Sequence, residues 1–294
     1  MSRILVSGSR GLIGSALVRR LDTAGWDVSG FDIADGLDVA DPEAVAAALN
    51  GCEGVIHLAA MSRVVWGERD PARCRVVNVT GTGNVLSAAS RARRPPWVLV
   101  ASSREVYGQA VSFRVGEAAE LRPLNCYARS KVAAENLVAA SRDWGLQAFV
   151  IRFSSVCGEA TDHADRVVPA FVRHAAQGGT LRIDGIQTAV DFTHVDDVAV
   201  ALQTAVEMLA VGNRRLSTLH LVSGRRTSLS ELAEIAIGVA GRGQARVCPG
   251  RSYERQVVHR RPGTRRASTG WRAGIALEDG IGDLVKRFAA MTSP

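Results

Sequence analysis

Tyr127 and Lys131 are the residues whose types and spacing most directly indicate chemistry. The chain has only two lysines, and one of them follows a tyrosine by four positions. On a helix this spacing places both side chains on one face, about one turn apart. A free phenol titrates near pH ~10 and is a poor base at neutral pH, but an adjacent ammonium group favours its ionised form. The pair therefore predicts a proton-transferring site on a helix.

Three glycines near the N-terminus predict a partner for this site. Gly8, Gly11 and Gly14 follow the apolar run 4–7, and a helical pattern continues over 12–24. In a dinucleotide-binding turn, the first glycine permits the tight bend, the second lets a pyrophosphate approach the backbone, and the third allows close packing of helix on strand. The pyrophosphate would lie at the positive end of the helix. A glycine triplet of this kind can also be a purely structural turn.

Asp32 favours the interpretation of the glycine triplet as a dinucleotide-binding turn over that of a purely structural turn. It lies in a second apolar run, 28–33, eighteen residues after Gly14. A carboxylate at this position can accept hydrogen bonds from ribose hydroxyls and would repel a 2′-phosphate, so it predicts NAD as the cofactor. Arg10, inside the turn, is the counter-argument, since an arginine there could bind the 2′-phosphate of NADP. Its alternative role is that of a solvated loop residue.

The elements that must position these residues alternate along the chain. Apolar runs that predict buried strands, and the helical segments between them, fall at 55–60, 76–93, 97–102, 125–144 and 147–153. This alternation predicts an α/β fold with a Rossmann-type, doubly wound parallel sheet. Ligands of such sheets bind beyond the carboxyl ends of the strands, and Ser102 and Ser103 lie at one of those ends.

Composition restricts the class of protein. The 294 residues are 47% hydrophobic, enough for a large core, and no apolar run reaches the roughly 18 residues of a membrane helix. The five cysteines are odd in number and lack metal-ligand spacing, which predicts thiols in a reducing compartment. The N-terminus has no secretory pattern. We therefore expect a cytoplasmic protein without a metal and without a membrane partner.

Arginine supplies most of the net charge of +7, and nine arginines between 242 and 272 are accompanied by one acidic residue, Glu254. Three interpretations compete for this stretch: a solvated surface, contacts to a substrate diphosphate, and nucleic-acid binding. No interleaved aromatic residues or recognition-helix pattern support the third interpretation. We therefore expect no nucleic-acid partner.

Taken together, the motifs resemble the extended short-chain dehydrogenase/reductase family, in its NAD-dependent nucleotide-sugar epimerase/dehydratase branch. Besides the glycine turn, the motifs are Asp38-Val39, His57-Leu-Ala-Ala60, Asn78-Val-Thr-Gly81, Ser102-Ser-Arg-Glu-Val-Tyr-Gly108, Pro123-x-x-x-Tyr127-x-x-Ser130-Lys131, Asp191-Phe-Thr-His-Val-Asp-Asp197, Arg261-Pro-Gly263 and Gly270-Trp271. They span nearly the whole chain. With the residues of the glycine turn, the resemblance implies a cofactor site made of Gly8, Arg10, Gly11, Leu12, Ile13, Gly14, Asp32, Asp38, Val39, Leu58, Ala59, Ala60, Asn78, Ala101, Ser102, Tyr127, Lys131 and Phe153.

The resemblance also implies roles at the reacting end. Ser103 would hydrogen-bond the reacting sugar hydroxyl and Tyr127 would remove its proton, while Lys131 would hold the nicotinamide ribose and lower the pKa of Tyr127. An epimerase then lets the keto-sugar turn over and returns the hydride to its other face. Tyr107 is expected to pack near the site rather than to act as the acid/base. The branch further implies a homodimer in which the helices at 76–93 and 127–144 form a four-helix bundle.

Departures from the pattern of the branch concern the substrate. The asparagine that often touches the sugar-nucleotide phosphates is Ser155 here, and Val190 stands where an arginine often precedes Asp-Phe. A nearby arginine such as Arg166 or Arg182 could compensate for that loss, and Arg261 remains a candidate diphosphate ligand. We therefore expect the nucleotide-sugar to contact Ser103, Ser155, Arg166 and Arg261.

Glu105 leaves the reaction open. Nucleotide-sugar 4,6-dehydratases use an Asp-Glu pair at this place to eliminate water after oxidation, but this chain has Arg104-Glu105. A guanidinium cannot protonate a leaving hydroxyl at neutral pH. Glu105 is therefore either a catalytic base or a residue that orients structure or substrate. We expect an epimerase. The alternatives are a dehydratase or an NAD(P)H-dependent ketoreductase on the same fold and, from a different class, a non-catalytic dinucleotide-sensing protein.

The second half of the chain predicts interleaved domains. We expect residues 1–158 plus about 187–224 to form the NAD-binding domain, and about 159–186 plus 225–294 to form a smaller C-terminal substrate-binding domain. Helices are predicted at 228–240, with a cap region at Ser230, and at 277–288. Asp196 and Asp197 are expected to cap a helix rather than to bind a metal.

Overall fold

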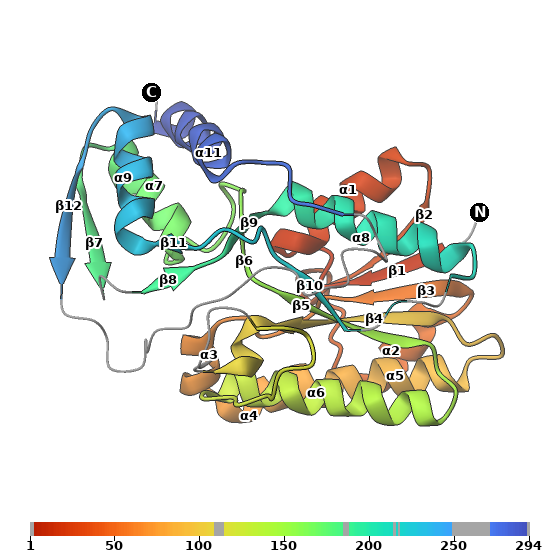
Figure 1. The fold of residues 1–294 in the computed structure, drawn as a ribbon. Coiled ribbons are helices and arrows are strands. Elements are labelled where there is room, and N and C mark those ends of the chain that lie inside the picture. The colour runs from red at the N-terminus through yellow and green to blue at the C-terminus, as the bar shows by residue number, and fades with distance from the viewer. Residues whose placement is uncertain are drawn as a thin grey trace.

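A six-stranded parallel sheet forms the centre of the molecule (Figure 1). The computed structural model describes residues 3–108, 115–184, 188–213, 216, 218–248 and 271–292. In spatial order the strands are β10 (Leu219–Leu221), β5 (Ala148–Phe153), β4 (Trp97–Ser103), β3 (Cys52–His57), β1 (Arg3–Ser7) and β2 (Asp27–Phe31). All neighbouring strands of this sheet run parallel. The predicted Rossmann-type fold class is confirmed.

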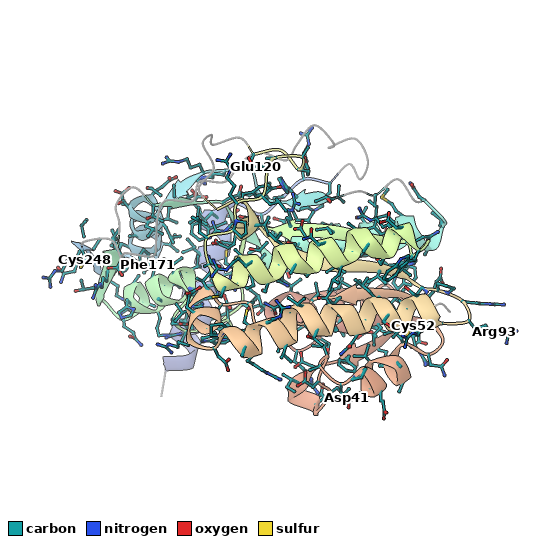
Figure 2. All side chains as sticks on the ribbon, turned by 90° about the horizontal axis from the view of Figure 1, so that it is seen from below. Asp41, Cys52, Arg93, Glu120, Phe171 and Cys248 are labelled. Atoms are coloured by element: carbon teal, nitrogen blue, oxygen red, sulfur yellow. The ribbon has the colours of Figure 1, made fainter. Side chains whose placement is uncertain are left out.

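Helices cover both faces of the sheet, which buries the apolar strands on two sides. One face carries α1 (Leu12–Thr23) and α8 (Val195–Ala210), and its core includes Leu17 and Leu202. The other face carries α2 (Pro42–Leu49), α5 (Gly81–Arg91) and α6 (Cys126–Asp143), and its core includes Val85 and Val138. Figure 2 shows α5 and α6 side by side along the molecule. The sheet is thus wound on both sides, as the alternation predicts.

The helix predicted at 76–93 begins earlier and is composite. It starts as α4 (Pro71–Arg75), continues through the π-helical turn η2 (Val76–Thr80) and ends as α5. Asp70 caps the start by accepting a hydrogen bond from the backbone N–H of Arg73 at 2.9 Å, and proline takes the first helical position. Because apolar periodicity does not register a cap or a π-turn, the sequence reading missed the first turns.

A smaller group of elements lies beside the carboxyl edge of the sheet (Figure 1). It comprises the short strands β6 (Ser155–Cys157), β7 (Thr180–Asp184), β8 (Ala189–Val190), β9 (Phe192–His194), β11 (Thr227–Ser228) and β12 (Gln244–Cys248), with the helices α7 (Val167–Ala176), α9 (Leu229–Ala240) and α11 (Leu277–Thr292). Its own core includes Val172, Leu232 and Leu284. Strand β8 pairs with β11 across the expected domain boundaries, so the division into two domains stays a prediction.

Two predicted helix caps are wrong. In α9 the cap is Ser228, whose hydroxyl accepts from the Glu231 N–H at 3.1 Å, while Ser230 lies within the first turn. In α8 the cap is His194, whose Nδ1 accepts from the Asp196 N–H at 3.2 Å. Asp197 instead accepts hydrogen bonds from two backbone N–H groups of the segment before α11. Asp196 and Asp197 do lie in the first turn of α8, so the predicted charge at this helix N-terminus is confirmed although the capping residue is not.

All five cysteines are free thiols. Within the described ranges, no helix is both long and apolar enough to cross a bilayer. In the same ranges, no group of three or more His, Cys, Asp or Glu residues could hold a metal ion.

Candidate active site

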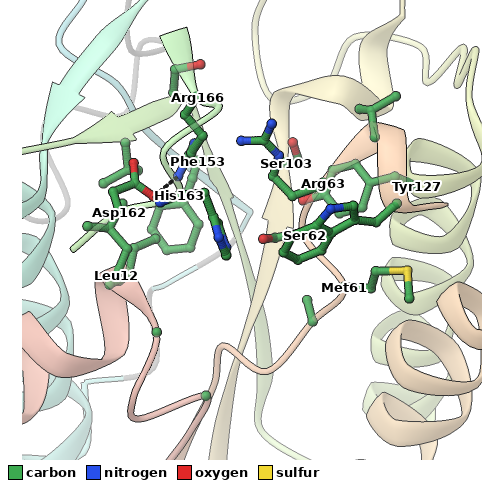
Figure 3. A pocket seen from close by; sticks show the side chains of 18 of the residues that line it. Leu12, Met61, Ser62, Arg63, Ser103, Tyr127, Phe153, Asp162, His163 and Arg166 are labelled. Atoms are coloured by element: carbon green, nitrogen blue, oxygen red, sulfur yellow. Dashed lines mark hydrogen bonds and ion pairs between the residues drawn. The ribbon is translucent and has the colours of Figure 1, made fainter. Parts of the chain in front are cut away.

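A cavity of about 1080 Å³ opens at the carboxyl ends of the central strands (Figure 3). Because the strands are parallel, the segments that follow β1, β2, β3, β4 and β5 meet at this edge. Its walls contain nearly all predicted site residues: Gly8, Arg10, Gly11, Leu12, Ile13, Gly14, Asp32, Asp38, Val39, Leu58, Ala59, Ala60, Ala101, Ser102, Ser103, Glu105, Tyr127, Lys131, Phe153, Ser155 and Arg166. Asn78 is not part of the lining, and Arg261 lies outside the described residues.

The glycine turn between β1 and α1 has the shape that a pyrophosphate needs. Gly8 has a φ of +73°, and a Cβ on Gly14 would lie 2.0 Å from the carbonyl oxygen of Gly8. Gly11 caps α1 without a side-chain hydrogen bond, and the first turn has no acidic residue. The backbone N–H groups and the positive end of α1 are therefore available to an anion. These residues fit a dinucleotide.

Asp32 stands at the end of β2 with its orientation fixed. Its Oδ2 accepts from the Arg10 N–H and its Oδ1 from the Ala34 N–H, both at 2.9 Å. The guanidinium of Arg10 points elsewhere. It donates to Asp35 through Nε at 3.0 Å and through Nη2 at 2.6 Å, which lowers the pKa of Asp35 and raises that of Arg10. The cation that could bind a 2′-phosphate is thus already engaged by Asp35, a residue that the sequence reading did not consider.

The structure brings Ser103, Tyr127 and Lys131 together at the other end of the cavity. Ser103 ends β4, and Tyr127 and Lys131 lie one turn apart in the first half of α6. The Ser103 side chain favours the ionised form of the Tyr127 phenol. The Lys131 ammonium group donates to the carbonyl oxygen of Ala101 at 2.9 Å and lies 6.0 Å from the centre of the Tyr127 ring. All three predicted residues are at most 8% exposed.

The pKa values at this end correct one expectation. Burial raises the pKa of Tyr127 to about 12, although the hydrogen bond to Ser103 acts in the opposite direction. Burial lowers the pKa of Lys131 to about 8. The expected lowering of the Tyr127 pKa by Lys131 is therefore not found. The physical reason is that desolvation of the phenolate outweighs the attraction of an ammonium group that is bonded to a backbone carbonyl.

Asn125 fixes the start of α6 and the position of Glu105. Its Oδ1 caps the helix by accepting from the Ala128 N–H at 2.7 Å, and its Nδ2 donates to Oε2 of Glu105 at 3.3 Å. The other oxygen of Glu105 pairs with Nη2 of Arg104 at 3.2 Å. Both carboxylate oxygens of Glu105 are thus held by protein groups at the cavity wall.

Asn78 lies one layer behind the cavity. Its side chain is fully buried, and its amide accepts from the Met61 N–H at 2.8 Å and donates to the Met61 carbonyl at 3.1 Å. The amide also donates to Oγ of Ser130 on α6 at 2.8 Å. Asn78 therefore holds the segment that follows β3, which includes the lining residues Leu58 and Ala60, against α6.

A buried polar network backs the wall at Ser102. Its hydroxyl donates to Glu135 at 2.5 Å, and the same carboxylate forms a two-point ion pair with Arg152 at 2.5 and 2.9 Å. Arg152 also donates to the hydroxyl of Tyr107, which lies 2.5 Å from Nε2 of His220. Tyr107 thus lies behind the wall, and burial raises its pKa to about 12.

Sequence reasoning missed two contacts that cross the cavity. The Arg63 guanidinium pairs with Asp165 at 2.7 Å, and the rings of Trp66 and His163 meet edge to face with their centroids 4.7 Å apart. Figure 3 places Arg63 on the side of Ser103, and His163 on the facing side. The segments are about a hundred residues apart in sequence, so no local pattern could reveal that they meet.

Several known proteins with similar sequences or folds are sugar-nucleotide enzymes, and they differ in reaction type. The chain is 30% identical to a UDP-glucose 4-epimerase of Mycolicibacterium smegmatis, over 97% of this chain and 98% of that one. It is 26% identical to a GDP-6-deoxy-D-mannose reductase of Pseudomonas aeruginosa, over 95% and 94%. Its structure matches a dTDP-glucose 4,6-dehydratase of Streptomyces venezuelae, crystallised with NAD, with a TM-score of 0.87, 26% identity and coverage of 99% and 97%.

The family assignment follows from a match over most of the chain. Residues 4–216, from β1 to beyond α8, match the family described as "NAD dependent epimerase/dehydratase family". This match agrees with the glycine turn, with Asp32 and with the Tyr127–Lys131 spacing, and it confirms the predicted family and its cofactor, NAD. The chain belongs to the NAD-dependent epimerase/dehydratase family.

Proposed function

We propose that this protein is an NAD-dependent epimerase of a nucleotide-sugar. The observation that carries the proposal is that Ser103, Tyr127 and Lys131 line the same cavity as the glycine turn, with Lys131 one turn from Tyr127. The relatives named above have epimerase, dehydratase and reductase activities, each on a sugar nucleotide by its name. They support a sugar nucleotide as the substrate. They do not distinguish the reaction types, so the reaction is inferred from the residues of this chain.

The proposed roles follow from the geometry of the site. The hydroxyl groups of Ser103 and Tyr127 hold the reacting sugar hydroxyl, and Tyr127 takes its proton and later returns it. Lys131, anchored on β4, binds the nicotinamide ribose. When bound, oxidised NAD supplies a hydride acceptor and a positive charge, and a positive charge beside a phenol lowers its pKa. Proton and hydride both return to the sugar, so an epimerase needs no external reductant.

A dehydratase is the second candidate, and the surroundings of Glu105 count against it. Elimination needs an acid that protonates the leaving hydroxyl. The residue next to Glu105 is Arg104, whose guanidinium does not release a proton at neutral pH. Both oxygens of Glu105 are already bonded to protein groups. We therefore propose that Glu105 orients Arg104 and the start of α6 rather than acting as a base.

Product analysis on purified protein tests the function. UDP-glucose and other nucleotide-sugars are incubated with the protein, and configuration at each sugar carbon is followed by NMR. We expect exchange at one carbon, and Tyr127→Phe lowers the rate by about 10²–10⁴-fold because it removes the acid/base. Tyr107→Phe is the matched control, since it removes a buried phenol outside the cavity and keeps turnover.

The other outcomes separate the alternatives. An eliminated product identifies a dehydratase, and stoichiometric consumption of NADH or NADPH identifies a ketoreductase. Retained NAD with no turnover on any sugar nucleotide favours the dinucleotide-sensing protein. In each case the epimerase proposal is abandoned.

We also propose a homodimer built on α5 and α6, which lie side by side on one face of the molecule (Figure 2). The chain mass is 31.2 kDa, so light scattering during gel filtration should report twice that value. A monomer at micromolar concentration would contradict the dimer. We propose further that the protein acts in the cytoplasm, where its free cysteines stay reduced.

A further inference from the structure

Two buried polar atoms in the wall of the cavity have no hydrogen-bond partner. Within the described part of the chain, the buried side-chain atoms without a partner are Nη1 of Arg104, Oδ2 of Asp162, Nε1 of Trp97 and Oγ of Ser230. The first two belong to residues that line the cavity. Buried donors and acceptors are normally paired because leaving them unpaired is costly. Arg104 and Asp162 therefore each carry one hydrogen-bonding atom that no protein group satisfies.

Arg104 is the donor of this pair. It directly follows Ser103, and its side chain is 18% exposed. Nη2 of the guanidinium pairs with Glu105 at 3.2 Å, and Nη1 has no hydrogen-bond partner. A guanidinium is charged at every physiological pH and has five N–H donors in a planar fork, so it can serve Glu105 and a second carboxylate together. The group beside the reacting hydroxyl can therefore recognise an anion.

Asp162 is the acceptor, on the facing wall (Figure 3). Its side chain is 2% exposed, and its Oδ1 accepts from the His163 N–H at 2.8 Å and from Arg166 at 3.2 Å. Its Oδ2 has no partner. A carboxylate oxygen in this setting accepts from a hydroxyl donor, of which a sugar has several.

The charged side chains around Ser103 and Tyr127 carry more positive than negative charge. Four cations line this end of the cavity, namely Arg63, Arg104, Lys131 and Arg166, together with three carboxylates, namely Glu105, Asp162 and Asp165. Asp165 is 64% exposed, so water screens much of its charge, whereas its partner Arg63 is only 14% exposed. The charge of Arg166 also reaches Tyr127 and favours its phenolate. A carboxylate on the sugar would compensate this excess next to Arg104.

We propose that the glycosyl group of the substrate is a uronic acid, whose carboxylate binds Arg104 and one of whose hydroxyls donates to Asp162. The inference rests on the proposed function and specifies its substrate class. A carboxylate matches the fork of Arg104 in charge and in geometry. The competing assignment is that Arg104 serves the diphosphate of any nucleotide-sugar, and binding data distinguish the two.

The test measures dissociation constants of the NAD-loaded protein by calorimetry. The probes are UDP, UDP-glucose and UDP-glucuronate, which share the nucleotide and differ in the sugar, and the GDP-mannose and GDP-mannuronate pair tests a second nucleotide. We expect the acid to bind about tenfold or more tightly than its neutral counterpart in at least one pair. Equal binding of acid and neutral sugar in both pairs, or no binding of either acid, overturns the proposal.

Variants assign the preference to Arg104. Arg104→Gln should abolish the preference for the acid and leave UDP affinity within about twofold, whereas Arg104→Lys should keep part of it because the charge remains. Asp162→Asn should weaken both sugars and spare UDP. Arg122→Gln, at an exposed arginine paired with Glu120, is the matched control and should change nothing. If Arg104→Gln weakens UDP as much as UDP-glucuronate, the arginine serves the diphosphate and the proposal is wrong.

Binding and exchange of configuration are measured in separate experiments, so the two proposals fail separately. Tight, Arg104-dependent binding of the acid without any exchange of configuration would contradict the epimerase and keep the acidic substrate. Epimerisation of neutral sugars with no preference for the acid would support the epimerase and contradict the acidic substrate. Unchanged circular dichroism and unfolding temperature of each variant show that a lost preference does not reflect misfolding.

Discussion

The ammonium group of Lys131 lies 6.0 Å from the centre of the Tyr127 ring and donates to the carbonyl of Ala101 instead of to the phenol. The lysine is therefore anchored on β4, and its charge acts on Tyr127 through space. Burial raises the pKa of the phenol to about 12, so Tyr127 is protonated at neutral pH. Tyr127 becomes a usable base only when additional positive charge lies beside it, because that charge lowers the pKa of the phenol.

Lys131 should make the stability of the protein depend on pH. Its pKa is lowered from 10.5 to about 8, so between these values the unfolded chain holds a proton that the native chain has lost. The free energy of unfolding therefore rises with pH across this window, by at most about 1.4 kcal/mol per pH unit, and this contribution is lost as pH falls through 8. Tyr127, with its raised pKa, acts in the opposite direction only above about pH 10.

Urea unfolding of the wild type and Lys131→Met from pH 7.5 to 9.5 measures this effect. The difference in free energy of unfolding between the two proteins should change with pH in the wild type's favour. Two parallel curves would show that Lys131 keeps an ordinary pKa.

Ser103→Ala should reduce turnover and shift its pH dependence. The Ser103 hydrogen bond lowers the pKa of Tyr127, so its loss raises that pKa further and moves the rise of kcat with pH to more alkaline values. We expect kcat to fall by about 10²-fold. Ser103→Thr keeps the hydroxyl and should restore most of the rate. A profile that keeps its position in Ser103→Ala would show that the serine only binds substrate.

Asp35→Asn should relax the preference for NAD over NADP. The substitution removes the carboxylate that engages the Arg10 guanidinium at 2.6 and 3.0 Å, and the freed cation can then bind a 2′-phosphate. We expect NADP to bind roughly fivefold more tightly, with little change for NAD, as measured by fluorescence titration. Adding Arg10→Gln should cancel the gain. A gain that survives in the double variant would assign the effect to the lost negative charge alone.

Asn78→Leu should destabilise the protein and weaken cofactor binding together. It leaves the backbone groups of Met61 and the hydroxyl of Ser130 without their partner, at a cost of about 1–3 kcal/mol in the free energy of unfolding. The segment after β3 is then less well held, so the affinity for NAD falls as well. Asn50→Ala, at an exposed position directly after α2, is the control. Normal stability of Asn78→Leu would contradict the positioning role.

The sequence by itself determined the fold class and the main parts of the candidate site. The strand predicted at 97–102 is β4 (Trp97–Ser103), and the glycine turn and the Tyr127–Lys131 spacing lie on the predicted elements. These features are local: apolar periodicity, a turn that needs glycine, and a four-residue spacing are properties of short segments. Parallel strands then bring their carboxyl ends to one edge without further information.

Only the tertiary structure decided which charges meet and how strongly burial acts on them. Arg10 faces Asp35, Arg63 faces Asp165, and Asn78 turns away from the cavity, none of which follows from a motif. The direction of the Tyr127 pKa shift also needed the structure, since the neighbouring lysine predicts a lowering and burial produces a rise. Desolvation and ion pairing depend on segments far apart in sequence, and only the folded chain places those segments in contact.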